Sequence, residues 1–363
     1  MGRKIELGNG NYGFRAIRNT NHESRLRAET HCGVQARITI KEGPMKKRWL
    51  VVLVLVFSVT ILSVNRSMAD DEVKIGYLGI VLSLPTFVAL EKGYFQEQGL
   101  KVTATPFESG TLITDALVTG RIDVNAGSAI IGPWLVEQNM PGMYKIFIIY
   151  GNRAVLQDNT MALMVAKDSP LKGIADLKGK RMGTFPGIAS LVLAKAVLRS
   201  SFDPDKEITL IEVPPGNIVQ ALAAGQIDAY FAPEPFGMIG EAKGVGRRLV
   251  KSPLLLLNLK TGLPGGPFAF NSKFIKEKPL VAKKVKAAYY KAVDFIYTNE
   301  TEARKYLIKY ANLPEPFAMK IAFEYWTKVE EYDKSSGQPY FELLKKEGLF
   351  QKHIDTSRLF YQE

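Results

Sequence analysis

Residues 116–124 read Ala-Leu-Val-Thr-Gly-Arg-Ile-Asp-Val, and residues 221–229 read Ala-Leu-Ala-Ala-Gly-Gln-Ile-Asp-Ala. Ala, Leu, Gly, Ile and Asp recur in register. In both stretches an apolar helical turn ends at a glycine, which readily adopts the positive φ of a helix C-terminus, and a short strand follows. This repeated helix-to-strand joint predicts two similar α/β lobes whose strand ends face a shared ligand cleft. The alternative is a generic joint that recurs by chance, so the flanking sequence has to decide.

The composition is typical of a globular protein with about two domains. The chain has 363 residues, of which 46% are hydrophobic and 23% charged, and its net charge is +12. Residues 1–69 hold 12 Lys and Arg against 4 Asp and Glu, whereas the remainder holds 36 against 32. Because the basic excess lies mostly at the N-terminus, the remaining surface favours solubility over nucleic-acid binding.

The N-terminal region contains a predicted secretory signal peptide over residues 45–69. A basic start, Met-Lys-Lys-Arg, precedes the 16-residue, mainly apolar stretch 49–64, and Ser-Met-Ala at 67–69 suits cleavage before Asp70. This predicts an exported protein. The alternative is a retained membrane anchor, for which the apolar stretch is slightly short. Because a signal peptide works from the N-terminus, we interpret residues 1–44 as an over-extension that is disordered or not translated.

The mature segment lacks the residues that much of enzyme catalysis uses. Cys32 is the single cysteine, and two of the three histidines also precede the signal, which leaves His353. A Cys–His dyad and a zinc site of the usual Cys/His type are therefore excluded there. Neither Ser109 nor Ser128 lies in a G-x-S-x-G motif, and no phosphate-binding P-loop is present. We expect no catalytic residue, no metal and no cofactor.

The order of elements from residue 73 predicts a mainly parallel sheet. A strand at 73–78 is followed by a helix at 85–92, a strand at 101–107, a helix at 111–118 and a strand at 123–126. Such a βαβαβ unit places ligands at the carboxyl ends of its strands. A similar alternation follows over residues 161–236. The C-terminal part is helical by pattern, most clearly at 281–297, 302–310 and 317–329.

Four motifs resemble those of the periplasmic solute-binding proteins of ABC importers in the nitrate/sulfonate/taurine group. They are residues 91–102 (Glu-Lys-Gly-Tyr-Phe-Gln-Glu-Gln-Gly-Leu-Lys-Val), the two Gly-x-Ile-Asp joints, residues 176–183 (Asp-Leu-Lys-Gly-Lys-Arg-Met-Gly) and residues 232–236 (Ala-Pro-Glu-Pro-Phe). The resemblance covers most of residues 73–275.

The resemblance implies a type II periplasmic-binding fold, an α/β architecture of two lobes with mainly parallel sheets flanked by helices and a ligand cleft between them. Lobe 1 would comprise residues 70–163 and 263–363, with the C-terminal helices packed on it, and lobe 2 residues 164–262. Such a protein acts as a monomer and delivers its solute to an ABC transporter permease in the inner membrane.

Matching positions give ten candidate ligand-binding residues. Serine hydroxyls and the N–H groups of Gly127 and Gly187 suit an oxyanion or another polar head. A Glu234 carboxylate would oppose an anion unless the ligand also carries an amine or another donor, as taurine or a pyrimidine does. Alternatives remain open: the serines at 109 and 128 as turn formers, Glu234 as a solvated or salt-bridged strand end, and Phe236 as a core residue. The candidates are Gly79, Ile80, Ser109, Gly127, Ser128, Pro186, Gly187, Ser190, Glu234 and Phe236.

The loop at 79–84 is apolar, and no arginine falls at a candidate position. We therefore expect a small organic solute, such as a sulfonate, a taurine-like molecule or a pyrimidine, rather than bare nitrate. One alternative is an enzyme similar to the pyrimidine-precursor synthases of thiamin biosynthesis, although these depend on His and Cys residues that are missing here. A second alternative is a ligand-sensing module anchored by an uncleaved segment 49–64.

Overall fold

The computed structural model describes residues 71–152, 160–260 and 262–362, together with the backbone of three short N-terminal strands. β1 (Phe14–Arg18), β2 (Ser24–Ala28) and β3 (Ala36–Thr39) pair antiparallel within the segment that we expected to be disordered or untranslated. The predicted signal peptide, residues 45–69, lies outside the described residues. Residues 1–69 and 70–363 form separate units, and the second contains all the elements described below.

The larger sheet has six strands in the order β14-β7-β13-β6-β4-β5. β4 pairs in parallel with β5 and β6, whereas β13 runs antiparallel to both β6 and β7, and β14 runs antiparallel to β7. The strands are β4 (Asp71–Leu78), β5 (Leu100–Phe107), β6 (Val124–Ala126), β7 (Tyr144–Asn152), β13 (Leu263–Asn271) and β14 (Tyr325–Lys328).

The smaller sheet has five strands in the order β10-β9-β11-β8-β12. β9 pairs in parallel with β10 and β11, whereas β8 is antiparallel to β11 and β12. The strands are β8 (Met161–Ala166), β9 (Arg181–Thr184), β10 (Thr209–Glu212), β11 (Ala229–Pro233) and β12 (Gly246–Val250).

Both sheets are therefore mixed, which corrects the expectation of mainly parallel sheets. The chain passes from β7 in the larger sheet to β8 in the smaller one, and later returns through β13. Parallel neighbours are joined by crossover connections that are usually helical. A strand that enters directly from the other sheet has no such crossover, and here β8 and β13 each run antiparallel to both of their neighbours.

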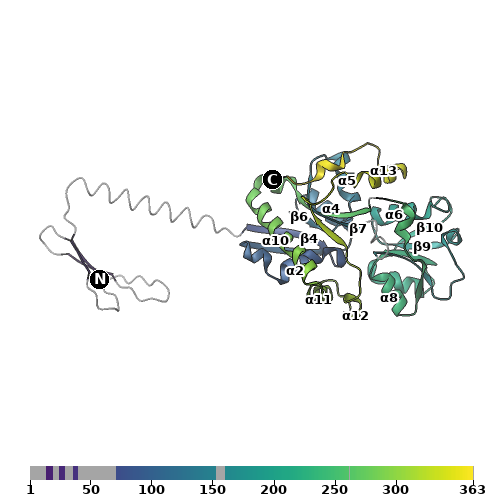
Figure 1. Ribbon diagram of the computed structural model, residues 1–363, viewed down its shortest axis with the longest axis horizontal. Coiled ribbons are helices and arrows are strands. Elements are labelled where there is room, and N and C mark those ends of the chain that lie inside the picture. The colour runs from purple at the N-terminus through teal and green to yellow at the C-terminus, as the bar shows by residue number, and fades with distance from the viewer. Residues whose placement is uncertain are drawn as a thin grey trace. The chain divides into compact units, whose positions relative to one another are not determined.

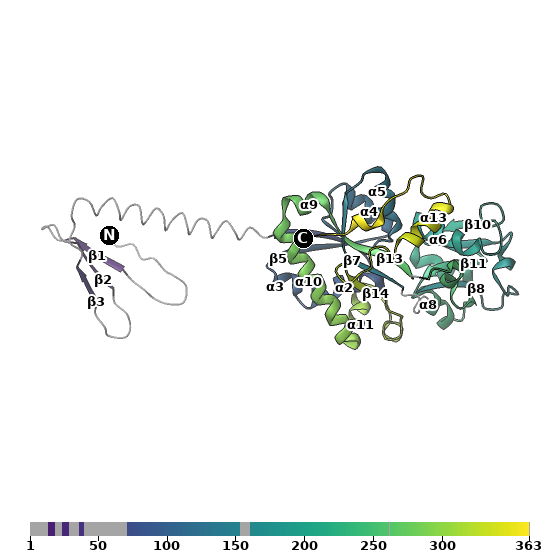
Figure 2. The same cartoon turned by 45° about the horizontal axis from the view of Figure 1, so that its top comes forward.

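Helices cover both faces of each sheet (Figures 1 and 2). α2 (Leu84–Glu91), α3 (Tyr94–Glu97), α10 (Pro279–Thr298) and α11 (Glu300–Tyr310) form one apolar core with the larger sheet. α4 (Gly110–Val118), α5 (Ile131–Asn139) and α13 (Gln338–Lys346) lie on its other face. α6 (Ile188–Leu198) packs on one face of the smaller sheet, and α7 (Ile218–Ala223) and α8 (Phe236–Ala242) pack on the other. Among the residues that the structure describes, no helix is both long and apolar enough to cross a membrane.

The α-helices are α2 (Leu84–Glu91), α3 (Tyr94–Glu97), α4 (Gly110–Val118), α5 (Ile131–Asn139), α6 (Ile188–Leu198), α7 (Ile218–Ala223), α8 (Phe236–Ala242), α9 (Ser272–Glu277), α10 (Pro279–Thr298), α11 (Glu300–Tyr310), α12 (Glu315–Ala318) and α13 (Gln338–Lys346). Short 3-10 turns occur at η2 (Val81–Ser83), η3 (Ile174–Leu177), η4 (Pro215–Asn217), η5 (Pro253–Leu257) and η6 (Thr356–Leu359).

The two helix-to-strand joints have the same detailed structure. Their glycines have φ values of 72° and 66°. In the first joint, Asp123 donates its N–H to the Lys74 carbonyl and accepts the Lys74 N–H on its carboxylate, both at 2.8 Å. In the second, Asp228 makes the same pair of bonds with Arg181, again at 2.8 Å. The aspartate therefore fastens the joint to the neighbouring strand in both lobes.

The isoleucine of each joint packs against a glycine on that neighbouring strand. A Cβ placed on Gly76 would lie 2.7 Å from Ile122 Cδ1, and one on Gly183 would lie 2.7 Å from Ile227 Cδ1. Both isoleucines are buried. The Ile-Asp pair thus docks the joint through an apolar contact and two hydrogen bonds, which explains why these two residues recur together.

We expect Gly183→Ala to lower the free energy of unfolding by about 1–2 kcal/mol, because the added methyl overfills a closed contact. Ile227→Val removes the Cδ1 atom that the methyl would meet. The double variant should therefore be more stable than the sum of the two single effects predicts. Urea denaturation of the four proteins measures this coupling, and strictly additive losses would contradict the packing described for the joint.

The expected helix at 317–329 is wrong. The segment instead contains the end of α12, a turn and β14, which forms the edge of the larger sheet. Trp326 is 1% exposed, lies opposite Tyr150 of β7, and donates its indole N–H to the Leu82 carbonyl at 3.0 Å. Aromatic residues suit a half-buried strand, so tertiary pairing overrides the helical pattern. The helices expected at 281–297 and 302–310 are confirmed as α10 and α11.

Candidate functional site

A cavity of about 1060 Å³ lies between the two sheets and takes its walls from both. Residues 78–82 and 106–111 line it from the larger sheet, and residues 185–190 and 215–217 line it from the smaller one. The segment 311–313 contributes a further wall. Ligand pockets commonly measure about 300–1,000 Å³. The size and the mainly apolar walls suit an organic molecule better than a bare inorganic ion.

The N-termini of α4 and α6 meet at this cavity from opposite lobes. A Cβ placed on Gly187, which precedes α6, would lie 3.0 Å from Thr111 Oγ1 in the first turn of α4. Ser109 caps α4, since its Oγ accepts the Leu112 N–H at 3.3 Å. The other first-turn N–H groups have no partner within their helices. Two helix N-termini therefore favour an acceptor or negatively charged group at this end of the cavity.

Seven of the ten candidate residues line the cavity. Gly187 has φ 107°, and its N–H donates to Glu212 Oε1 at 2.9 Å, so this N–H is not free for a ligand. Its contribution is instead the close approach of α6 to α4. That these seven residues contact the ligand remains a prediction. They are Gly79, Ile80, Ser109, Pro186, Gly187, Ser190 and Phe236.

Gly127 and Ser128 are not among the cavity-lining residues. Asn125 Oδ1 accepts both of their N–H groups, at 3.2 and 3.1 Å, and Asn125 Nδ2 donates to Ser128 Oγ at 2.6 Å. A Cβ on Gly127 would collide with Ser83 Oγ. The two residues thus form a closed, buried turn at the end of β6, and their expected hydrogen bonds to a ligand are already made within the protein.

Glu234 also lies behind the cavity wall. It is 3% exposed, and its carboxylate accepts Arg248 Nη2 at 2.5 Å and the Met238 N–H at 3.0 Å. This corresponds to the salt-bridged strand end that the sequence left open. The carboxylate fastens the start of α8 to β12, and the next two residues, Pro235 and Phe236, line the cavity. Glu234 therefore supports the wall rather than forming its surface.

Sequence reasoning missed Glu324, which lines the cavity just before β14. Its Oε2 is buried and has no hydrogen-bond partner among the described residues. Burial raises the pKa of this carboxyl from its ordinary 4.5 to about 7. Burial and the nearby Glu324 also raise the pKa of Tyr150 well above 10. The available signal was one carboxylate within the aromatic run Phe-Glu-Tyr-Trp at 323–326, which the helical interpretation concealed.

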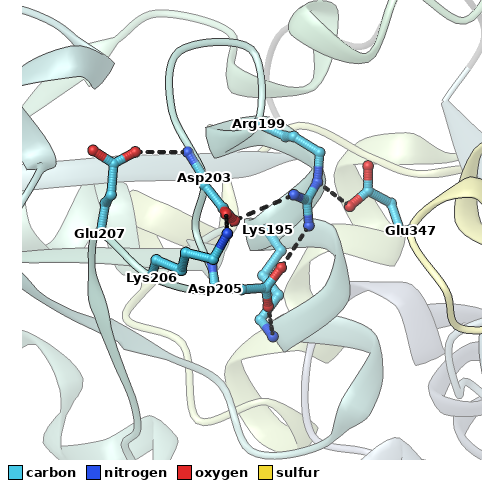
Figure 3. A network of polar contacts seen from close by, with 7 residues as sticks. All are labelled: Lys195, Arg199, Asp203, Asp205, Lys206, Glu207 and Glu347. Carbon is cyan, nitrogen blue, oxygen red and sulfur yellow. Dashed lines mark hydrogen bonds and ion pairs between the residues drawn. The ribbon is translucent and has the colours of Figure 1, made fainter.

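The C-terminal helix α13 lies beside the segment that follows α6. Arg199, directly after α6, forms ion pairs with Glu347, directly after α13, and with Asp205 at 2.8 Å (Figure 3). Tyr340 on α13 lines the cavity, and the neighbouring Phe341 packs edge to face on Trp134 of α5 with ring centroids 5.6 Å apart. α13 was expected to pack on the first lobe, and it does so while also contacting the second.

Residues 67–312 match the NMT1-like family. The chain is 25% identical over 243 residues to the nitrate/nitrite binding protein NrtA of Nostoc sp., which covers 61% of this chain and 53% of that protein. It spans about half the length of the first curated relatives it matches, with shares of 40%, 48% and 53%.

Solved structures share the fold. The alkanesulfonate-binding protein SsuA from Xanthomonas axonopodis pv. citri, bound to MOPS, has a TM-score of 0.66 and 22% identity over 81% of this chain and 99% of that one. The periplasmic nitrate-binding protein NrtA from Synechocystis PCC 6803 has a TM-score of 0.61 and 19% identity, covering 80% and 85%. The desulfurization enzyme DszB has a TM-score of 0.58 and 15% identity, covering 81% and 97%. The two-lobed α/β architecture predicted from the sequence is confirmed.

Proposed function

This chain belongs to the NMT1-like family, and we propose that it is the solute-binding component of an ABC importer. It binds a small organic solute between its lobes and delivers it to a permease of the inner membrane. The observation that carries the proposal is the cavity of about 1060 Å³, walled by both lobes and met by the N-termini of α4 and α6. The nitrate- and sulfonate-binding proteins with this fold support it.

The solute has an apolar body and a polar or acidic head. Phe185 and Phe236 line the cavity from the smaller sheet and pack edge to face, with ring centroids 5.0 Å apart. Ile80 and Leu82 line it from the larger sheet. These side chains cover an apolar body, while the first turns of the two helices accept the head. Sulfonates, taurine-like molecules and pyrimidines have suitable size and chemistry.

We propose that the protein binds its solute without transforming it. The described lining includes no histidine and no cysteine, which are the side chains on which the thiamin pyrimidine-precursor synthases of the enzyme alternative depend. The protein acts instead by closing. The lobes approach where Gly187 meets Thr111, and the ion pair between Arg199 and Glu347 holds α6 beside the C-terminal segment. The closed monomer then docks on its permease.

The protein works in the periplasm, to which the predicted signal peptide directs it. Cleavage after Ala69 releases a mature chain that begins at Asp70, and β4 starts at the next residue, Asp71. The absence of the leader therefore removes no part of either sheet. A retained segment 49–64 would instead hold the protein at the membrane as the anchored sensing module.

The proposed function predicts a thermal shift with the right solute. The protein is recovered from the periplasmic fraction of a Gram-negative host, where mass spectrometry should identify Asp70 as its first residue. It is screened against sulfonates, taurine, nitrate, bicarbonate, pyrimidines and aromatic acids. A ligand at 100 times its Kd adds about 2.7 kcal/mol to the free energy of unfolding. We expect organic acids to raise Tm and nitrate to leave it unchanged. Stabilisation by nitrate alone would contradict the proposed solute class.

A further inference from the structure

Glu324 is a buried acidic group of the cavity that the proposed function leaves unexplained. Its Oε2 has no hydrogen-bond partner among the described residues, although a buried polar atom normally has one. The neighbours of Glu324 in the chain, Phe323 and Tyr325, are aromatic, and Glu324 itself lines the cavity. An unpaired buried carboxylate is costly. The missing partner has its place in the cavity, where the solute binds.

The charged groups of the described cavity lining are mainly acceptors. Glu324 contributes to the raised pKa of Tyr150 on β7, and the Tyr150 hydroxyl donates its proton to the Ser128 carbonyl at 2.9 Å. That proton is therefore not available to an anion placed beside Glu324. The other charged residues of the described lining are exposed: the carboxylates Glu108 and Asp115, and the ammonium of Lys243. Acidic groups thus outnumber basic ones, and the described lining contains no arginine.

We propose that Glu324 accepts a charge-assisted hydrogen bond from an ammonium or similar cationic N–H group of the solute. This inference rests on the proposed solute-binding function and narrows its solute class. The solute is amphoteric: an acidic head lies at the N-termini of α4 and α6, a cationic nitrogen lies at Glu324, and an apolar body lies between them. The buried carboxylate then has its partner, and the cationic group has its counter-charge.

The direction of the pH dependence separates this arrangement from its opposite. Burial raises the pKa of Glu324 to about 7 in the empty protein. A bound cation favours the carboxylate and lowers that pKa, so binding releases a proton and the affinity rises as the pH increases through 7. An oxyanion at the same place would need the protonated acid as a donor, and its affinity would fall over that range. Tyr150 stays neutral throughout, because its pKa is raised well above 10.

Matched pairs of probes that differ by one amine test the assignment. They are taurine and ethanesulfonate, 4-(aminomethyl)benzenesulfonate and 4-methylbenzenesulfonate, and 4-(aminomethyl)benzoate and 4-methylbenzoate. Calorimetry measures each Kd at pH 6 and pH 8. We expect the amine of at least one pair to bind about 10- to 100-fold more tightly at pH 8, as a hydrogen bond to a charged group allows. The preference should shrink at pH 6.

Glu324→Gln should abolish this preference while the amine-free partner keeps its Kd. Glu315→Gln is the matched control, since Glu315 is exposed in the same C-terminal region and does not line the cavity; it should keep the preference. Equal binding of the two members in every pair that binds, or a preference that survives in Glu324→Gln, overturns the role of Glu324 and leaves the solute-binding function intact. Failure of every probe to bind, with a folded protein, counts against the proposed solute class itself.

Discussion

Replacing Arg248 with methionine should lower the free energy of unfolding by about 3 kcal/mol at pH 7. Glu234 is 3% exposed, and its carboxylate accepts hydrogen bonds from Arg248 and from one backbone N–H. Removing one partner of a buried ion pair leaves an uncompensated charge, which typically costs about 3–5 kcal/mol. The Arg248 side chain is 23% exposed, so water relieves part of the penalty and the lower end applies. Urea denaturation monitored by circular dichroism measures the loss.

The matched control is Lys178→Met, because the Lys178–Glu207 ion pair has similar geometry, at 2.9 Å, on an exposed surface. Exposed pairs contribute at most about 1 kcal/mol. The double variant Glu234→Gln/Arg248→Met should recover much of the stability lost in Arg248→Met, since no buried charge remains. An Arg248→Met loss no larger than that of the control would contradict the buried pair.

The same double variant separates the two roles considered for Glu234. As a ligand contact, which the sequence predicted, Glu234 would be needed for affinity whatever the state of Arg248. As a support for the cavity wall, it matters only through the position of Phe236. We therefore expect the folded double variant to bind a confirmed solute within a few-fold of the unchanged protein. A large loss of affinity at full stability would restore the contact role.

The features that the sequence predicted well are local. A glycine that ends a helix, an isoleucine that docks on a neighbouring glycine and an aspartate that caps the next strand all act within a few residues of one another or on the adjacent strand. The Gly-x-Ile-Asp joints and the order of strands and helices up to Phe236 could therefore be predicted from the sequence. The antiparallel pairing of β8 and β13 was not, because it depends on where the chain crosses between the sheets.

The features that the sequence did not predict depend on partners far away in the chain. Gly187 appeared available to a ligand, but its N–H is bound by Glu212 on another strand. The N–H groups of Gly127 and Ser128 are bound by the side chain of Asn125, the middle residue of a fully buried strand. Glu324 was hidden because its burial follows from the pairing of β14 with β7. Residue types showed which hydroxyls and N–H groups exist, whereas tertiary contacts decide which of them remain free.

Glu324 should also make the empty protein less stable as the pH rises. Burial raises the pKa of its carboxyl from 4.5 to about 7, so the folded state keeps its proton where the unfolded state has lost it. The stability from this group is fully present below pH 4.5, falls between about pH 4.5 and 7, and is flat above that range. A shift of this size corresponds to about 3 kcal/mol. Urea denaturation of the protein and of Glu324→Gln at pH 5, 6, 7 and 8 measures the difference.

The variant should gain stability relative to the unchanged protein as the pH increases, since glutamine has no proton to lose. All other ionisable groups are common to both proteins, so their contributions cancel in the difference. A constant difference between the two proteins from pH 5 to 8 would contradict a buried, unpaired Glu324. An amphoteric solute at saturating concentration should reverse the trend, because it stabilises the carboxylate that burial disfavours. The protein is therefore least stable when its cavity is empty and Glu324 is ionised. A cationic group of the solute removes that loss of stability by pairing with the carboxylate.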